Sequence, residues 1–171
     1  MAGQTIGIVL AGGQSSRMGR DKAQLPWQGT CLLDRMCRLL SETGVDRVVV
    51  SGNRAGYECF PDTEPGSGPG FALSGVLARL PAHARALIVP IDMPLLTPAL
   101  LGRLLAYPAA CFADHPLPAV LPAGEALQGH SIKGLHRVAG SVTLQATPEE
   151  VAILVNANTP EEWQRMQEIA R

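Results

Sequence analysis

A glycine-rich and positively charged segment follows the first apolar run of the chain. The apolar run covers residues 6–9, and residues 10–22 then read LAGGQSSRMGRDK. Glycines let a backbone approach a ligand closely and direct its N–H groups at an anion. Arg17 and Lys22 could neutralise phosphate oxygens, the arginine as a planar fork and the lysine as a point charge. The alternative is a tight turn with solvated cations, but two basic residues beside the end of a strand favour a phosphate site.

Asp92 is the second group that could do chemistry. It follows residues 86–91, a nearly continuous apolar run that predicts a buried central strand. A carboxylate at the end of such a strand is costly unless something pairs with it. A Mg²⁺ ion bound to phosphates would do so, because Mg²⁺ commonly takes one or two carboxylates together with phosphate oxygens. The alternative is a helix N-cap or a salt bridge to an arginine of the loop, and we favour the metal.

Polar side chains also follow two other predicted strands. Ser51 and Asn53 lie at the end of residues 47–51, and Asn156 follows residues 151–155. Ligands of open α/β sheets bind outside the carboxyl ends of the strands. We therefore expect these side chains to meet the glycine-rich segment and the aspartate in one crevice.

Three further polar residues have an alternative structural role. Asn158 and Thr159 could do no more than cap the last helix, whereas Asn156 has no such role and is the better site candidate. Asp62 could be a second polar contact or a turn residue, because it begins a stretch dense in proline and glycine.

The elements that would position these groups alternate between strands and helices. Strands are predicted at 5–10, 47–51, 86–91 and 151–155, and the runs 109–113 and 118–122 could be strands despite their prolines. Helices are predicted at 31–43, 71–80 and 129–139, and also from Thr97 and from Thr159. This alternation predicts an α/β layered sandwich with a mostly parallel sheet. A length of 171 residues favours a single domain.

Composition and motifs exclude several classes of function. The formal net charge is −1, so the chain lacks the basic excess of a general nucleic-acid binder. It has neither an apolar run long enough to cross a membrane nor the basic start of a signal peptide. The four cysteines form no C-x-x-C pair, which predicts free thiols in a cytoplasmic protein.

Other catalytic and binding motifs are also missing from the sequence. The glycine-rich segment has no G-K-[ST], which a Walker A loop requires, and does not read G-x-G-x-x-G. No G-x-S-x-G marks a nucleophilic serine, and the four histidines lack the spacing of metal ligands.

The chain resembles the molybdenum cofactor guanylyltransferases, within the wider MobA-like nucleotidyltransferases. The resemblance rests on L-A-G-G-x-S-x-R-M-G-x-D-K at 10–22 and on V-V-V-S-G-N-R at 48–54. It continues with Asp62, L-S-G at 73–75, I-D-M-P at 91–94, D-H-P at 114–116 and V-N-A-N-T-P-E-E at 155–162. These motifs occur in the order that the family shows and cover nearly the whole chain. They imply a three-layer, Rossmann-like nucleotidyltransferase fold over residues 1–171.

The resemblance also implies an activity and its substrates. The terminal phosphate of molybdopterin, carrying molybdenum, attacks the α-phosphorus of GTP, pyrophosphate leaves, and the guanine dinucleotide form of the cofactor is made. Such a transfer depends on positioning and charge neutralisation more than on acid–base residues. The resemblance further allows transient contact with other proteins of cofactor biosynthesis or with the molybdoenzymes that receive the product.

Individual residues take roles from the resemblance. Asp92 holds Mg²⁺, Lys22 and Arg17 contact the phosphates, and Asn156 and Asn158 face the pterin or the metal. The remaining candidates contact the nucleotide, and these are Leu10, Ala11, Gly12, Gly13, Ser51, Asn53, Asp62 and Gly75.

The sequence departs from the family pattern in three places. Ser51 stands where relatives often have asparagine, so a nucleotide contact could shift to Asn53. The stretch G-S-G-P-G-F-A-L-S-G is longer than the family's usual G-P-L-A-G. The region between Asp92 and Asn156 is poor in basic residues, with Lys133 and Arg137 as its main cations, so recognition of the pterin has the least support.

Two alternatives to the guanylyltransferase remain from the sequence. One is a related enzyme that uses CTP or a sugar-phosphate acceptor, although such enzymes more often read L-A-A-G at the first turn. The other is a nucleotide-binding regulator without catalysis, against which the presence of both Lys22 and Asp92 argues.

Overall fold

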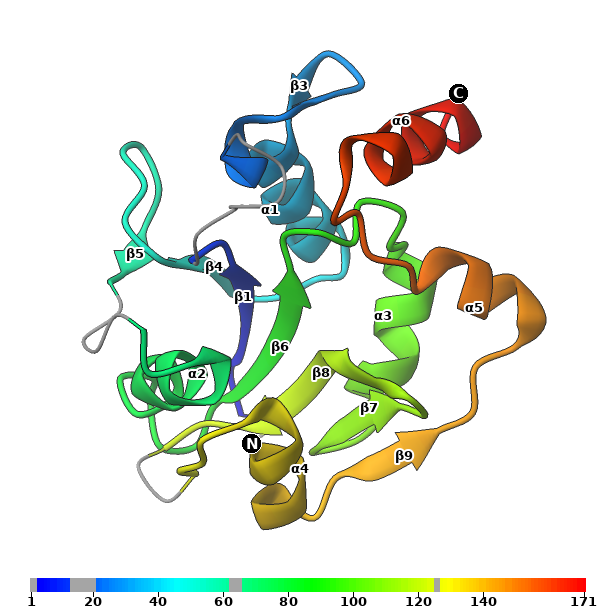
Figure 1. Ribbon diagram of the computed structural model, residues 1–171. Helices are drawn as coiled ribbons and strands as arrows, with labels where there is room; N and C mark the ends of the chain where they lie inside the picture. The colour runs from blue at the N-terminus through cyan, green and yellow to red at the C-terminus, as the bar shows by residue number, and fades with distance from the viewer. Residues whose placement is uncertain (1–2, 13–20, 62–65, 125–126) are drawn as a thin grey trace.

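A mostly parallel sheet forms the centre of the protein. The computed structural model describes residues 3–12, 21–61, 66–124 and 127–171 (Figure 1). Seven strands in these residues pair in the order β5-β4-β1-β6-β8-β7-β9. They are β1 (Thr5–Leu10), β4 (Arg47–Ser51), β5 (Cys59–Phe60), β6 (Arg85–Pro90), β7 (Ala110–Phe112), β8 (His115–Pro122) and β9 (Val142–Leu144). Only β8 runs antiparallel to its neighbours, β6 and β7; the other pairs of this sheet are parallel.

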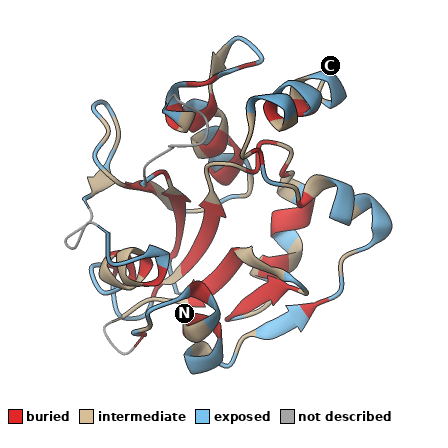
Figure 2. Cartoon of the chain, viewed as in Figure 1, coloured by how far each residue is buried: buried red, intermediate tan, exposed pale blue. Residues whose placement is uncertain are grey.

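Helices cover both faces of this sheet. Side chains of α1 (Leu32–Glu42), α3 (Pro98–Leu105) and α6 (Pro160–Ile169) belong to the hydrophobic core on one face. Those of α2 (Pro69–Leu77) and α4 (Ile132–Ala139) belong to the core on the other face. Figure 2 shows the buried central strands between helices that are buried on one side and exposed on the other. The three-layer, mostly parallel α/β arrangement predicted from the sequence is confirmed.

The residues of β6 show why its sequence is almost continuously apolar. Leu87 and Val89 point into the core with α1 and α3, whereas Ala86 and Ile88 point into the core with α2 and α4. All four side chains are fully buried. Successive side chains of a strand alternate between the two faces, and a strand covered on both faces therefore needs apolar residues throughout.

The helix α1 forms as its apolar periodicity predicts. Its five buried residues lie on one face and are Leu32, Leu33, Met36, Leu39 and Leu40. Complete burial of one such side chain is worth about 1.5–3 kcal/mol. The helix ends before Gly44, whose φ of 82° is the left-handed conformation that glycine adopts at little cost.

The strand predicted at residues 151–155 is wrong. These residues include the end of helix α5 (Pro148–Ile153) and the start of the irregular segment that follows it. A capping box starts this helix: the Thr147 hydroxyl accepts from the Glu150 backbone N–H, and the Glu150 carboxylate accepts from the Thr147 N–H. This cap and a proline in the first turn outweigh the strand preference of the apolar residues that follow.

The outer part of the sheet is built from other segments. The runs 109–113 and 118–122 do contain β7 and the end of β8, and the edge beyond β7 is β9, which the sequence pattern did not reveal. A small hairpin of β2 (Pro26–Trp27) and β3 (Thr30–Cys31) follows the single-turn 3₁₀ helix η1 (Lys22–Gln24). No helix in the described part of the chain has the length and apolar character needed to cross a membrane.

Candidate nucleotide-binding site

The carboxyl ends of three neighbouring strands define the candidate site. β1 lies between β4 and β6, with Leu10 in register with both Ser51 and Pro90. Hydrogen bonds continue past the strand ends, because the N–H of Ala11 donates to the carbonyl of Ser51 (3.2 Å) and that of Ile91 to the carbonyl of Leu10 (3.1 Å). The start of the glycine-rich segment therefore lies between the residues that follow β4 and β6.

Lys22 and Asp92 meet at this edge together with two asparagines. The ammonium nitrogen of Lys22 lies 3.6 Å from Oδ2 of Asp92 and donates to Oδ1 of Asn158 at 3.0 Å. The side-chain amide of Asn156 donates to Oδ1 of Asp92 at 2.9 Å. The side chains of Lys22 and Asp92 are 15% and 20% exposed, so both charges are largely removed from water yet still open to a ligand.

The backbone around Lys22 is fixed by the residue before it. Asp21 is the N-cap of η1, and its carboxylate accepts the N–H of Ala23 at 3.1 Å. Ala23 is buried, and the N–H of Leu25 donates to the carbonyl of Lys22. These contacts fix the direction in which the Lys22 side chain leaves the backbone.

The two asparagines lie in the segment between α5 and α6, and not at the end of a strand as predicted. Ala157 between them is buried, and its N–H donates to the backbone carbonyl of Asp92 at 2.8 Å. Asn156 and Asn158, on either side of it, both reach the Lys22–Asp92 pair. This irregular segment thus brings to the site the side chains that the predicted strand was expected to bring.

At the start of α6, one residue caps the helix and a different residue contacts the site. Thr159 is the N-cap, in a second capping box with Glu162. The Glu162 carboxylate accepts the N–H groups of Asn158 (2.7 Å) and Thr159 (3.0 Å), and these hydrogen bonds hold the pKa of Glu162 below its ordinary value. The side chain of Asn158 takes no part in the cap and instead contacts Lys22.

The other predicted site residues have no described contact with Lys22 or Asp92. Ser51 is buried and Leu10 half-buried, whereas Gly12 and Asn53 are exposed beside them. Gly75 lies within α2, and no described contact joins it to Lys22 or Asp92. Gly13, Arg17 and Asp62 lie outside the described residues.

One residue of this site was missed by the sequence analysis. Arg54, three positions after the end of β4, donates to both carboxylate oxygens of Asp21 and, at 3.0 Å, to the carbonyl of Ala11. It ends the motif S-G-N-R, but nothing in the sequence indicates that its side chain turns back toward residue 21.

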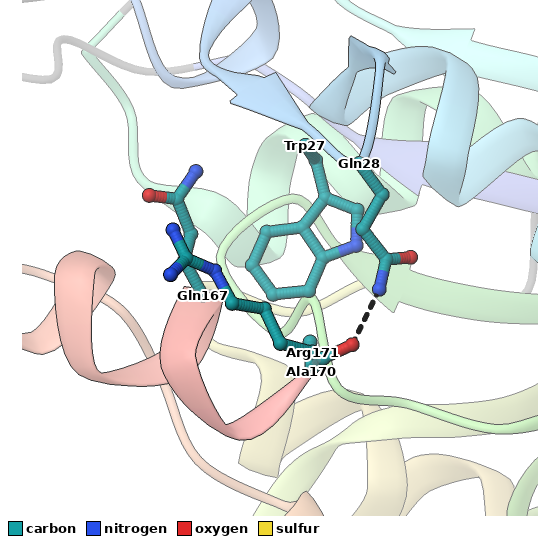
Figure 3. A pocket seen from close by; sticks show the side chains of 5 residues that line it. All are labelled: Trp27, Gln28, Gln167, Ala170 and Arg171. Carbon is teal, nitrogen blue, oxygen red and sulfur yellow. Dashed lines mark hydrogen bonds between the residues drawn. The ribbon is translucent and has the colours of Figure 1, made fainter.

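A cavity of about 230 Å³ lies elsewhere, between the β2–β3 hairpin and the end of α6. Figure 3 shows its lining, formed by Trp27, Gln28, Gln167, Ala170 and Arg171. Gln28 donates to the carbonyl of Ala170 at 2.7 Å across it, as the dashed line marks. None of the predicted site residues lines this cavity, and we interpret it as a gap in the packing between the hairpin and α6.

Residues 7–139 match the family model of the MobA-like NTP transferase domain. The chain therefore belongs to this family of nucleotidyltransferases. Its curated relatives are more specific. It is 43% identical to the molybdenum cofactor guanylyltransferase of Xanthomonas euvesicatoria pv. vesicatoria, over 94% of this chain and 93% of the relative. It is also 32% identical to that of Rhodobacter capsulatus, over 96% of both chains.

Solved structures share the fold at lower identity. A nucleotidyl transferase from Methanothermobacter superposes with a TM-score of 0.72 at 21% identity, covering 96% of both chains. The molybdopterin-guanine dinucleotide biosynthesis protein A of Archaeoglobus fulgidus gives a TM-score of 0.68 at 20% identity, covering 96% of this chain and 98% of that one.

Proposed function

We propose that this protein transfers GMP from GTP to molybdopterin carrying molybdenum, which yields the guanine dinucleotide cofactor and pyrophosphate. The observation that carries the proposal is the cluster of Lys22, Asp92, Asn156 and Asn158 at the carboxyl edge of the sheet. The names of the curated relatives support the guanine nucleotide and the pterin acceptor. The CTP-dependent and inactive alternatives have no specific observation in their favour.

The reaction asks for positioning and charge neutralisation. A phosphate oxygen of the pterin forms a bond to the α-phosphorus of GTP, and the bond from that phosphorus to the oxygen bridging to the β-phosphate breaks, with pyrophosphate carrying away the electron pair. The nucleophile is already an anion, so no general base is needed. Lys22 would bind the triphosphate and stabilise the negative charge that grows on the leaving group.

Asp92 fits the requirements of a Mg²⁺ ligand. Each of its carboxylate oxygens has one described neighbour, Asn156 or Lys22, and therefore retains acceptor capacity. No group of three His, Cys, Asp or Glu side chains in the described ranges could hold a metal by itself, which is consistent with an ion held largely by substrate phosphates. A structure of similar fold from Mycobacterium tuberculosis, with a TM-score of 0.63 at 21% identity, was solved as a manganese complex. When bound, the ion would supply further neutralisation of the triphosphate charge.

The cellular setting follows from the same proposal. All four cysteines are free thiols, as is usual in the reducing cytoplasm, where we place the enzyme. GTP and molybdopterin are its proposed substrates, and residues 1–171 are proposed to act as one nucleotidyltransferase domain.

Calorimetric titration of the purified protein with GTP, CTP, ATP and UTP, each with Mg²⁺, tests the proposal. Selective GTP binding that is lost in Lys22→Ala is the expected result. Arg38→Ala is the control, because Arg38 is an exposed cation of α1 away from the site. A preference for CTP would keep the reaction type and change the product, and binding that survives in Lys22→Ala would remove Lys22 from the phosphate site.

A further inference from the structure

We propose that Arg54 is a positioning residue of the nucleotide site, which holds Lys22 in place by fixing the residue before it. The inference rests on the proposed function, since it is the triphosphate that Lys22 is proposed to bind. Arg54 itself contacts neither Lys22 nor Asp92 among the described interactions, and it would act through Asp21.

A single guanidinium links two residues near the opposite ends of the glycine-rich segment, Ala11 and Asp21. One terminal nitrogen of Arg54 donates to Oδ2 of Asp21, and the other donates to Oδ1 of Asp21 and to the carbonyl of Ala11, both at 3.0 Å. Ala11 directly follows β1, and Asp21 directly precedes Lys22. A paired fork of this kind fixes both the distance and the angle between its partners, which a single hydrogen bond does not.

The same aspartate carries the turn that presents Lys22. Oδ1 of Asp21 accepts from Arg54 and also from the N–H of Ala23, which is the N-cap hydrogen bond of η1. The side chain of Arg54 is 21% exposed and that of Asp21 is 39% exposed, so the fork is partly shielded from water. Loss of Arg54 would leave the cap hydrogen bond to Ala23 but remove the fork that orients the Asp21 carboxylate, and the start of η1 would be held less firmly.

The segment that carries Arg54 is itself held in place. The thiol of Cys59 donates to the carbonyl of Arg54 (3.2 Å) and accepts from its N–H (3.3 Å). Three positions after Arg54, the hydroxyl of Tyr57 donates to the carboxylate of Asp34 on α1 at 2.5 Å, and this hydrogen bond lowers the pKa of Asp34. The guanidinium therefore reaches Asp21 from a fixed support.

Stability alone explains this arginine poorly. Its Nε is buried and has no hydrogen-bond partner among the residues that the structure describes. A buried donor without a partner is costly, and a smaller residue would avoid that cost. What the arginine provides against that cost is the geometry that its two terminal nitrogens impose on Asp21 and Ala11.

The test compares Arg54→Ala and Arg54→Lys with Arg47→Ala. Arg47 lies on β4, pairs with Glu58 at the surface, and does not touch the site, so its loss controls for removing an arginine from the same part of the sheet. Measurements are GTP affinity by calorimetry, kcat and KM for GTP, thermal unfolding, and hydrogen exchange of the amides of residues 23–25.

Arg54→Ala is expected to raise the KM for GTP by about tenfold, a change equivalent to about 1.4 kcal/mol of binding, and to speed exchange at Ala23. Arg54→Lys should rescue little, because an ammonium cannot bridge both oxygens and the carbonyl as a fork does. Asp21→Asn keeps the helix cap but removes the charge that Arg54 contacts. In this background, Arg54→Lys should raise the KM for GTP much less than it does in the unsubstituted protein.

The inference would be overturned by full rescue in Arg54→Lys, by additive effects with Asp21→Asn, or by unchanged exchange at Ala23 in Arg54→Ala. Hydrogen exchange at Ala23 reports on the contact between Arg54 and Asp21 without any substrate. If the unsubstituted protein fails to bind GTP, the proposed function fails, whereas exchange at Ala23 still decides whether Arg54 fixes η1. Should Arg54→Ala fail to fold, the lysine variant and its combination with Asp21→Asn give the same decision.

Discussion

The ammonium nitrogen of Lys22 lies 3.6 Å from Oδ2 of Asp92, although the two residues come from opposite sides of β4 in the sequence. Each partner is held by its own asparagine, Asn158 for the lysine and Asn156 for the aspartate. A positive and a negative group are thus presented side by side, so that a triphosphate and the cation that accompanies it could be held at one point. Predictions for Asp92, for Lys22 and for the helix cap at Thr159 follow from this arrangement.

Asp92→Asn is expected to slow the proposed Mg²⁺-dependent transfer strongly, with little effect on folding. A bound metal contributes several kcal/mol to such reactions, so the rate should fall by at least about a hundredfold. The unfolding free energy should change by no more than about 1 kcal/mol, because a partly exposed ion pair contributes little. Turnover and urea denaturation measure the two effects, with Glu42→Gln at the exposed end of α1 as the control. Unchanged turnover would show that Asp92 has no part in the reaction.

The affinity lost in Lys22→Ala should depend on how many phosphates the nucleotide carries. Loss of a charge-assisted hydrogen bond weakens binding by about tenfold or more, and we expect this loss for GTP but a smaller one for GMP. The affinity of the unsubstituted protein for GTP should also fall with added salt, because salt screens the exposed part of the interaction. Equal losses for GTP and GMP, measured by calorimetry, would place the β- and γ-phosphates away from Lys22.

Thr159→Ala and Thr147→Ala form a matched pair. Each threonine is the N-cap of a helix with a complete capping box, so each substitution should cost about 1 kcal/mol of unfolding free energy. Only Thr159 adjoins Asn158, which contacts Lys22. GTP affinity should therefore fall in the first variant alone, and an equal fall in both would mean that the effect comes from general loss of stability.

His136 should make the stability of the protein depend on pH. It is buried, its Nδ1 and Nε2 lie 2.8 Å from the hydroxyl of Ser141 and the carbonyl of Pro116, and burial lowers its pKa from the ordinary value of 6.5. The unfolded chain therefore binds a proton more readily than the folded one. Stability should be fully present above about pH 6.5 and decrease as the pH falls from there through the folded-state pKa.

Urea denaturation from pH 7 to pH 5 measures this dependence. The decrease should be weaker in His136→Gln, which cannot become protonated, and should persist in His83→Gln, because His83 is exposed. A slope that remains in His136→Gln and disappears in His83→Gln would contradict the prediction.

The sequence predicted those parts of the fold whose local pattern and environment agree. β6 is apolar because both faces of it are covered, and α1 repeats its leucines at helical spacing. Residues 151–155 were misassigned because a run of β-branched and aliphatic residues follows a strong helix start at Thr147. β9 has only three residues on the edge of the sheet, where exposed side chains give no alternation to detect.

The site shows a similar division. Strand ends place Ala11, Ser51 and Asp92 close together through the parallel register of β4, β1 and β6, which the order of elements in the sequence already suggests. The contact of Arg54 with Asp21 depends instead on the path of a loop and on the direction of one long side chain. No spacing rule in the sequence encodes that path, so the residue became visible only in the structure.

The position of Asn156 and Asn158 has a consequence for the timing of synthesis. A chain leaves the ribosome from its N-terminal side, so β1 is made early and cannot complete its pairing until β6 has been made. The hydrogen bond from Lys22 to Asn158 can form only after the residues that follow β9, the last strand of the sheet in sequence, have been made. A nascent chain that stops before α5 would carry the glycine-rich segment and Asp92 but neither asparagine. The ability to hold a nucleotide should therefore appear late, with the segment that joins α5 to α6.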